Sequence, residues 1–395
     1  MAGLSKSSEQ LTAVRESAVP GVALVHDWLN QVGGAEDVLE NLVELFPQAP
    51  IYTSMYWRER MPQHWRQWDI RTSFIDRLPW AHRRQQLYFP FYPLAFEQFD
   101  FREYDLVLSN KSGFCHGIVT GPETVHVCYC LTPTRYVWRY HQYAQQENLG
   151  PWTRRALIPF LHYLRLWDRV AADRVDHFIA ISQEVRRRIA RHYGRDATII
   201  YPPVDTARFT PANRVEDYYL IVARLVPYRR LDILIEAFNR LDRPLYIAGA
   251  GRDRARLEAM SGPNVNFLGY VSDDELPDLM ARCRAFLFPG EEDFGIAPIQ
   301  AMAAGRPVIA YAAGGALETV IPGTGMLFAE QSADAIIKAV ESFEPYDTDP
   351  AMIRSHAQQF DTSVFKHRIK DFVMQAMAQK SSARRQIRRV WAGGQ

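Results

Sequence analysis

The sequence is poor in cysteine, has almost no net charge and contains no long hydrophobic run. Four cysteines in 395 residues do not make a disulfide scaffold, and they fit a reducing compartment. The 46 Lys and Arg residues nearly balance the 45 Asp and Glu residues, which gives a net charge of +1. Because nucleic-acid binding rests on neutralising phosphates, this balance argues against a protein that wraps nucleic acid.

The absence of a long apolar segment excludes a membrane-spanning helix. The longest segment free of charged side chains, Leu45–Trp57, contains two prolines, and a spanning helix needs roughly 20 apolar residues. Residues 1–18 are polar and lack the apolar core of a signal peptide, so we expect a disordered lead-in to a cytoplasmic protein. The chain is nevertheless 47% hydrophobic, enough for more than one core, and its length predicts two or three domains.

Two halves of the chain carry the pattern of an α/β protein. Val19–Val25 is a short apolar run, followed by the glycine pair Gly33-Gly34 and a segment with helical spacing. Pro202-Pro203 interrupts the pattern, and after it near-continuous apolar strands alternate regularly with helical segments, as in a parallel sheet covered on both faces. We expect two doubly wound domains, 19–203 and 204–364, with ligands bound in a cleft outside the carboxyl ends of the strands.

The stretch Phe288–Arg306 is the most informative for chemistry. A strand ends at Pro289, an acidic turn follows, and a helix begins near Ile296. A helix N-terminus presents unpaired N–H groups that suit a phosphate, and Gly295 lets the backbone approach closely. Glu292 would repel a phosphate unless it met another part of the ligand, such as sugar hydroxyls. Alternatively, the acids only favour the helix N-terminus electrostatically.

The stretch Val222–Phe238 carries the bases. Arg224 follows a buried-looking strand, and Arg229 and Arg230 precede an amphipathic helix. Arg side chains at a strand end can hold a diphosphate in bidentate fashion, although such a cluster can also be a solvated surface. A second glycine pair, Gly314-Gly315, and the pair Gly33-Gly34 could each let a backbone approach a ligand, but a glycine pair is more often a plain turn.

Taken together, these residues resemble the retaining glycosyltransferases of family 4, which have the two-domain GT-B fold. Bacterial mannosyltransferases of O-antigen, exopolysaccharide or lipid-linked glycan assembly are the most similar in character. The matching segments span nearly the whole chain: Val25–Glu40, Tyr129–Trp138, Ile179–Ile189, Ile199–Phe209, Ala223–Phe238, Asn264–Leu276, Glu292–Tyr311 and Gly314–Val320.

The resemblance implies roles at matching positions. Glu292, the first Glu of the family's E-x7-E motif, would contact the donor sugar near the reacting centre, while Arg224 and Arg229 would neutralise the leaving diphosphate. Residues 365–395 would form a helix that crosses back to the N-terminal domain. The other donor-binding residues implied are Gly33 and Gly34 beside the diphosphate, Val271 at the nucleotide base, Phe294, Gly295 and Ile296 at the helix N-terminus, and Gln300 at the ribose.

Three departures from the family pattern bear on activity. Gln300 replaces the second Glu and lacks charge assistance for a ribose hydrogen bond. Arg229 replaces the usual Lys. Leu131 stands where members often have a His that touches the donor sugar, and His116 and His126 do not occupy that position. The alternative function is therefore a catalytically impaired nucleotide-sugar-binding or scaffold protein that partners an active transferase.

The expected reaction is transfer of a hexose, mannose from GDP-mannose being the first choice, to a glycan or lipid-linked acceptor. Charge grows on the departing phosphate, where the Arg side chains and the helix N-terminus already stand, so we expect no metal and no other cofactor. Asp347–Asp349 resembles a metal-binding DxD but lies in a polar loop. No second carboxylate is placed as a nucleophile, so we expect front-face transfer with retention.

Two further features concern partners. Cys128 and Cys130 have C-x-C rather than C-x-x-C spacing, and with His126 they share one face of a strand, so packing is favoured over a metal site. Aromatic and Arg residues interleave between Trp57 and Phe101, and Ser381–Gln395 is basic. Both segments suit contact with the inner face of the cytoplasmic membrane. Core or dimer contacts are the favoured alternative for most of the aromatics, and the C-terminal segment could equally be a frayed tail.

Overall fold

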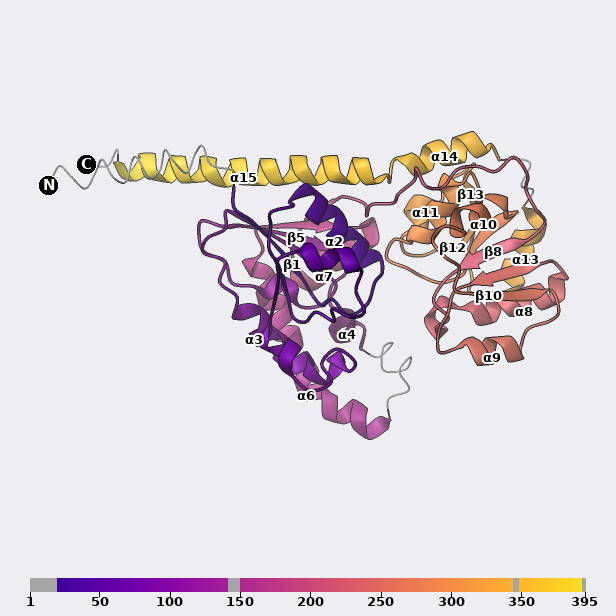
Figure 1. Ribbon diagram of the computed structural model, residues 1–395, viewed down its shortest axis with the longest axis horizontal. Coiled ribbons are helices and arrows are strands. Elements are labelled where there is room, and N and C mark those ends of the chain that lie inside the picture. Colours follow the sequence, from indigo (N-terminus) through magenta and orange to yellow (C-terminus); the bar gives the residue numbers. More distant parts are fainter. Residues whose placement is uncertain (1–19, 141–149, 344–347, 393–395) are drawn as a thin grey trace.

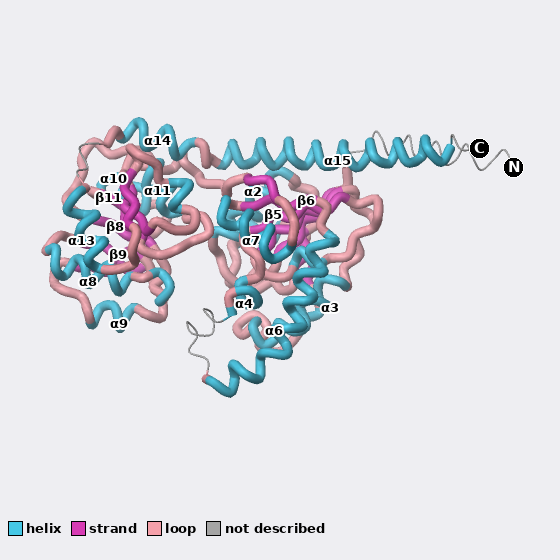
Figure 2. Tube along the Cα trace, turned by 180° about the vertical axis from the view of Figure 1, so that it is seen from behind, coloured by secondary structure: helices cyan, strands magenta, loops and turns pink. Residues whose placement is uncertain are grey.

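Each half of the chain folds around a parallel sheet in a computed structural model that describes residues 20–140, 150–343 and 348–392. The lead-in expected at residues 1–18 lies outside the described residues. Figure 2 shows the strands in the interior of each lobe with helices around them. The α/β class expected from the alternation of strands and helices is confirmed.

The N-terminal domain has seven strands in the order β3-β2-β1-β4-β5-β6-β7. Strand β5 is buried along its whole length because it lies inside the sheet with helices on both faces. Helix α2 buries Val38, Leu39, Leu42 and Val43, a spacing that places them on one face. The strands are β1 (Val22–His26), β2 (Ile51–Thr53), β3 (Ile70–Thr72), β4 (Leu106–Lys111), β5 (Val125–Cys130), β6 (His177–Ala180) and β7 (Ala197–Ile199), and the α-helices are α2 (Gly34–Leu45), α3 (Tyr92–Glu97), α4 (Arg135–Trp138), α6 (Pro151–Ala171) and α7 (Gln183–Tyr193). Short 3₁₀ helices are η1 (Gln63–Gln67), η2 (Phe74–Arg77), η3 (Gln85–Phe91), η4 (Cys115–Gly117) and η5 (Ala172–Arg174).

The C-terminal domain has six strands in the order β10-β9-β8-β11-β12-β13. The strand order reverses between β8 and β11, and in the first domain it reverses between β1 and β4. Open parallel sheets bind ligands outside the carboxyl ends of the strands at such switch points. The strands are β8 (Tyr219–Val222), β9 (Leu245–Ala248), β10 (Val265–Gly269), β11 (Ala285–Phe288), β12 (Val308–Tyr311) and β13 (Gly325–Phe328). The helices are η6 (Pro227–Arg229), α8 (Leu231–Leu241), α9 (Arg254–Ala259), α10 (Leu276–Arg282), α11 (Ile296–Ala303), α12 (Ala316–Thr319), α13 (Ala333–Ser342), α14 (Pro350–Gln358) and α15 (Thr362–Ala392).

Helix α15 leaves the C-terminal domain after α14 and runs along the N-terminal domain (Figure 1). It contacts α2 and β5, and Phe365, Ile369, Val373 and Ala376 are buried at helical spacing. Lys380 pairs with Asp176 at 3.0 Å. The side chains of residues 383–392, where much of the basic C-terminal segment falls, lie outside what the structure describes.

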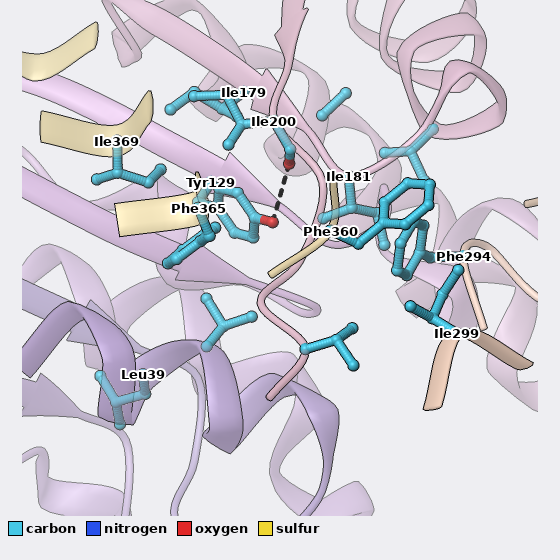
Figure 3. Close-up of a cluster of buried hydrophobic side chains, with 14 of the residues drawn as sticks. Leu39, Tyr129, Ile179, Ile181, Ile200, Phe294, Ile299, Phe360, Phe365 and Ile369 are labelled. Carbon is cyan, nitrogen blue, oxygen red and sulfur yellow. Dashed lines mark hydrogen bonds between the residues drawn. The ribbon is translucent and has the colours of Figure 1, made fainter. Parts of the chain in front are cut away.

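One apolar core joins the two domains and α15. Phe294 and Ile299 from the C-terminal domain belong to the same cluster as Ile179, Phe360 and Phe365. Figure 3 shows Phe294 and Ile299 beside Phe360, and Phe365 and Ile179 beside Tyr129, whose hydroxyl donates to the Ile200 carbonyl at 3.0 Å. Because burial of apolar surface drives association, this cluster holds the two domains together and so sets the position of one switch point relative to the other.

Cys128 and Cys130 are fully buried in β5, where packing residues are expected. His126 on the same strand lies 2.9 Å from the Ser109 hydroxyl through Nε2.

Candidate functional site

The two stretches singled out in the sequence meet at the switch point of the second sheet. Strands β8 and β11 pair in parallel, with Ala285 opposite Tyr219, so their carboxyl ends lie at the same edge. Arg224 follows β8, and Glu292 follows β11. A Cβ atom on Gly290 would lie 3.2 Å from the Arg229 carbonyl oxygen, which shows how closely the two loops approach.

Arg229 and Glu292 form an ion pair at this edge. Burial, together with the positive charges of Arg224 and Arg135, lowers the pKa of Arg229. Arg224 is exposed and donates to the Tyr228 hydroxyl at 2.9 Å, and among the described residues no carboxylate lies within ion-pair distance of it. Because Arg224 lacks a carboxylate partner and lies close enough to affect the pKa of Arg229, this edge carries positive charge that is available to an anionic ligand.

The other two acids of the turn bind the N-terminal domain. Asp293 accepts hydrogen bonds from Arg135 of α4 at 2.5 Å and from Arg188 of α7. Burial alone would raise the pKa of Asp293, but these two guanidinium groups outweigh it and lower the pKa to about 2. Glu291 pairs with Arg139 at 3.2 Å and with Arg188 at 3.4 Å. Glu292 is thus paired within its own domain, whereas Glu291 and Asp293 both pair with bases of the N-terminal domain and share Arg188.

The glycine pair Gly314-Gly315 packs against the backbone of this acidic turn. The Gly315 amide donates to the Glu292 carbonyl at 2.9 Å. Gly314 has φ +57°, and a Cβ atom there would lie 2.0 Å from the same carbonyl oxygen, so this position has no room for a side chain. The pair therefore approaches the backbone of the turn.

The start of α11 faces the first domain. Gly295 precedes the helix with φ +91°, and a Cβ atom on Gly34 would lie 2.8 Å from Cδ1 of Ile296. The glycine turn after β1 and the N-terminus of α11 are thus adjacent. The Phe294 side chain is buried, stacks on Tyr201 at 5.6 Å and packs against Phe360, so only its main chain is available to a ligand.

The remaining donor-binding residues implied by the resemblance, Gln300 and Val271, lie outside the loops that form the ion pairs. Gln300 is partly buried in the second turn of α11, and Val271 follows β10 and packs against the core joining the domains. Leu131 follows β5, where the sequence lacks the expected His, and its partly buried side chain packs against the same core.

A buried polar network holds the segment that follows Leu131. Asp168 accepts hydrogen bonds from Thr134 at 2.6 Å, Trp138 at 2.7 Å and Tyr193 at 2.8 Å. Burial alone would raise the pKa of Asp168. The positive charge of Lys111 and the hydrogen bonds have the larger, opposite effect, so the pKa of Asp168 lies below its usual range. This network fixes the backbone that carries Arg135 and Arg139 towards the acidic turn.

Sequence reasoning missed the three bases Arg135, Arg139 and Arg188. Arg135 follows the carboxyl end of β5 as Arg224 follows β8. A search for bases after the carboxyl ends of the parallel strands would therefore have found Arg135. Arg188 is one of three consecutive bases on α7, and nothing in their pattern marks it as the buried one.

The aromatic segment Trp57–Phe101 divides between core and surface. Trp65, Tyr92, Phe96 and Phe101 are buried, as the packing alternative expects. The exposed large side chains of this segment are Trp80, Leu87, Phe91 and Leu94.

Comparison with known families identifies both halves. A model described as Glycosyltransferase Family 4 matches residues 32–208, and one described as Glycosyl transferases group 1 matches residues 205–360. The chain thus carries two glycosyltransferase domains, one matching the family 4 model and one the group 1 model. The resemblance stated from the sequence motifs is confirmed.

Curated relatives of this chain include mannosyltransferases. It is 32% identical over 200 residues to a GDP-mannose-dependent monoacylated alpha-(1-6)-phosphatidylinositol monomannoside mannosyltransferase of Corynebacterium glutamicum, covering 42% of this chain and 52% of the relative. It is 29% identical over 161 residues to an O-antigen chain mannosyltransferase of Salmonella typhimurium, covering 37% and 45%. The chain thus spans about half the length of the curated relatives it matches.

Solved structures share the fold. A sucrose-phosphate synthase from Thermosynechococcus elongatus superimposes with a TM-score of 0.70 at 17% identity, and Anabaena HepE in complex with UDP and glucose with 0.64 at 19%. Each comparison covers 90% of this chain and 100% of the other. The expected GT-B fold is confirmed. Within the described residues, no helix has both the length and the apolar character needed to cross a bilayer.

Proposed function

We propose that the chain transfers a hexose with retention, mannose from GDP-mannose being the first choice, to a glycan or lipid-linked acceptor. The observation that carries the proposal is Arg224, which has no carboxylate partner in the described part of the chain, beside the Arg229–Glu292 ion pair at the β8/β11 switch point. The names of the mannosyltransferase relatives support mannose. The UDP bound to HepE makes UDP-sugars the second group of donors to test.

In this proposal the catalytic charges act on the leaving diphosphate. Arg224 and Arg229 would bind its oxygens, giving Arg229 an anionic partner in addition to Glu292. The first N–H groups of α11 would add donors where negative charge develops. Glu292 would orient the donor sugar, and the phosphate itself would help to deprotonate the acceptor on the same face. No residue of this set requires a metal.

Nucleotide release tests the donor and the metal. The purified chain is incubated with GDP-mannose and, separately, with UDP-sugars, and slow release of GDP or UDP to water is followed with and without EDTA. We expect release from GDP-mannose and no effect of EDTA. Tight binding without release from any donor, and no product with any acceptor, would instead favour the scaffold function. A clear loss of release with EDTA would contradict the metal-free mechanism.

We also propose that the chain works against the inner face of the cytoplasmic membrane. Leu87, Phe91 and Leu94 are each more than half exposed, next to the exposed Arg83 and Arg84, and apolar side chains beside Arg suit anionic lipid. Flotation with anionic vesicles at low salt tests this proposal. We expect co-flotation that Leu94→Glu weakens and that Val215→Glu, on an exposed loop of the other domain, leaves unchanged. Failure of the wild-type chain to float would contradict it.

A further inference from the structure

A polar cavity of about 360 Å³ lies in the N-terminal domain, apart from the ion pairs of the second sheet. Its walls come from the segments after β1, β2 and β3. The lining residues are Asn30, Gln31, Trp57, Arg60, His82, Arg83, Gln85 and Gln86. These three strands pair in parallel, so their carboxyl ends share the edge that carries Gly33-Gly34. The volume is within the usual range of small-molecule sites, roughly 300–1,000 Å³.

Two Arg side chains of this cavity contact the indole ring of Trp57. The Arg60 guanidinium lies 4.3 Å from the centroid of the indole ring and that of Arg83 lies 5.9 Å away. The His82 ring stacks on the same indole at 5.7 Å and is held by Asp76 at 2.8 Å. Within the described part of the chain, no carboxylate forms an ion pair with Arg60 or Arg83. Two pre-positioned guanidinium groups without an internal counter-ion favour an anionic ligand.

Carboxamides supply the rest of the lining. Asn30 donates to the His82 carbonyl at 3.1 Å and to the Gln85 side chain at 2.5 Å, which ties the first loop to the third. Gln31 and Gln86 also line the cavity and are exposed. Because a carboxamide both donates and accepts hydrogen bonds, these groups match hydroxyls.

We propose that this cavity binds a sugar or polyol that carries a phosphate or carboxylate, as the anionic part of the acceptor. Arg60 and Arg83 bind the anionic group, and Gln31 and Gln86 bind hydroxyls. Gln31 is three residues from Gly34, a span of at most about 11 Å, and Gly34 meets the first residue of α11. The cavity therefore lies next to the glycine turn that borders the proposed donor site. The name acceptor rests on the proposed function, whereas the anion-binding chemistry does not.

Calorimetric titration of the full chain with mannose 6-phosphate tests the proposal, with mannose and inorganic phosphate as reference ligands. We expect mannose 6-phosphate to bind more tightly than either reference. Arg60→Gln and Arg83→Gln should each weaken binding by about tenfold, the effect of losing one hydrogen bond to a charged group. The matched controls Arg102→Gln, on an exposed loop, and Arg224→Ala, in the proposed donor site, should bind as the wild type does.

A parallel titration with phosphatidylinositol vesicles, against phosphatidylcholine vesicles, separates a lipid headgroup from a free sugar. Binding to either ligand supports the proposal if it depends on Arg60 and Arg83. Binding to neither ligand, equal binding by the Arg60 and Arg83 variants, or loss of binding in Arg224→Ala would overturn it. Nucleotide release by the wild-type chain is measured separately. If the wild-type chain releases no nucleotide, the proposed function is contradicted, but the result on anion binding in this cavity is unaffected.

Discussion

At the scale of single residues, neighbouring carboxylates have distinct tasks because their partners differ. Glu292 pairs within its own domain with Arg229, whereas Asp293, one residue later, is buried against two bases of the other domain. Only Glu292 has a partner base with a neighbour, Arg224, that lacks a carboxylate partner among the described residues, which is why the donor role is proposed for Glu292.

Gln300 gives a prediction at this scale. If its side chain binds the ribose hydroxyls, Gln300→Glu adds a charge-assisted hydrogen bond and should tighten nucleotide binding several-fold, by about 1 kcal/mol. Calorimetric titration with GDP checks this expectation. Unchanged or weaker affinity would count against the ribose role.

His116 and His126 predict a pH dependence of stability. Burial lowers the pKa of His116 to about 4 and that of His126 to about 3, and Nδ1 of each ring has no hydrogen-bond partner among the described residues. In the unfolded chain each titrates near 6.5, so below that pH the unfolded state gains protons that the folded state does not. Each ring should therefore cost about 2 kcal/mol of stability at about pH 5, none above about pH 7.

Thermal unfolding at about pH 7 and about pH 5 measures this effect. His116→Gln should lose less stability than the wild type over that interval, because Gln cannot gain the proton. His162→Gln, an exposed position on α6, is the matched control and should behave as the wild type. Equal losses in His116→Gln and the wild type would refute the assignment.

At the scale of elements, turns after parallel strands build the site and glycines let them approach one another. The loop after β12 presses Gly314-Gly315 against the acidic turn after β11. The order and type of these elements could be predicted, because apolar strands alternate with amphipathic helices. The contact between the two turns could not, since a glycine pair in sequence looks the same in any tight turn.

Gly314→Ala should displace Glu292. The new Cβ atom would overlap the Glu292 carbonyl at a backbone φ of +57°, a strain of about 1–3 kcal/mol. We expect reduced nucleotide release together with a lower Tm. Gly121→Ala, where the nearest atom to an added Cβ is 3.9 Å away, should leave both unchanged. Wild-type release and Tm in Gly314→Ala would show that the turn is not held by this contact.

At the scale of the whole molecule, ion pairs and a shared apolar core fix how the domains meet. Arg188 and Asp293 are both buried at this junction. Sequence motifs indicated the residues proposed for the donor site in the second domain, because these residues cluster within two short stretches. They did not indicate the bases from α4 and α7, whose partners lie more than 100 positions away in the chain.

Asp293→Asn should destabilise the domain junction. Removing one charge leaves Arg188 buried without full compensation, which costs about 3–5 kcal/mol. We expect a lower Tm by calorimetry and faster limited proteolysis between the domains. Asp173→Asn removes an exposed pair with Arg169 and should cost no more than about 1 kcal/mol. Equal effects of the two variants would contradict the role given to Asp293.

The most direct test of the central claim is nucleotide release from the donor by Arg224→Ala and Glu292→Ala, each compared with the wild type and with Arg102→Ala. The account predicts that both site variants lose release while keeping the wild-type circular dichroism spectrum and Tm, and that Arg102→Ala retains it. Near wild-type turnover in either folded site variant would contradict the assignment of this junction as the donor site.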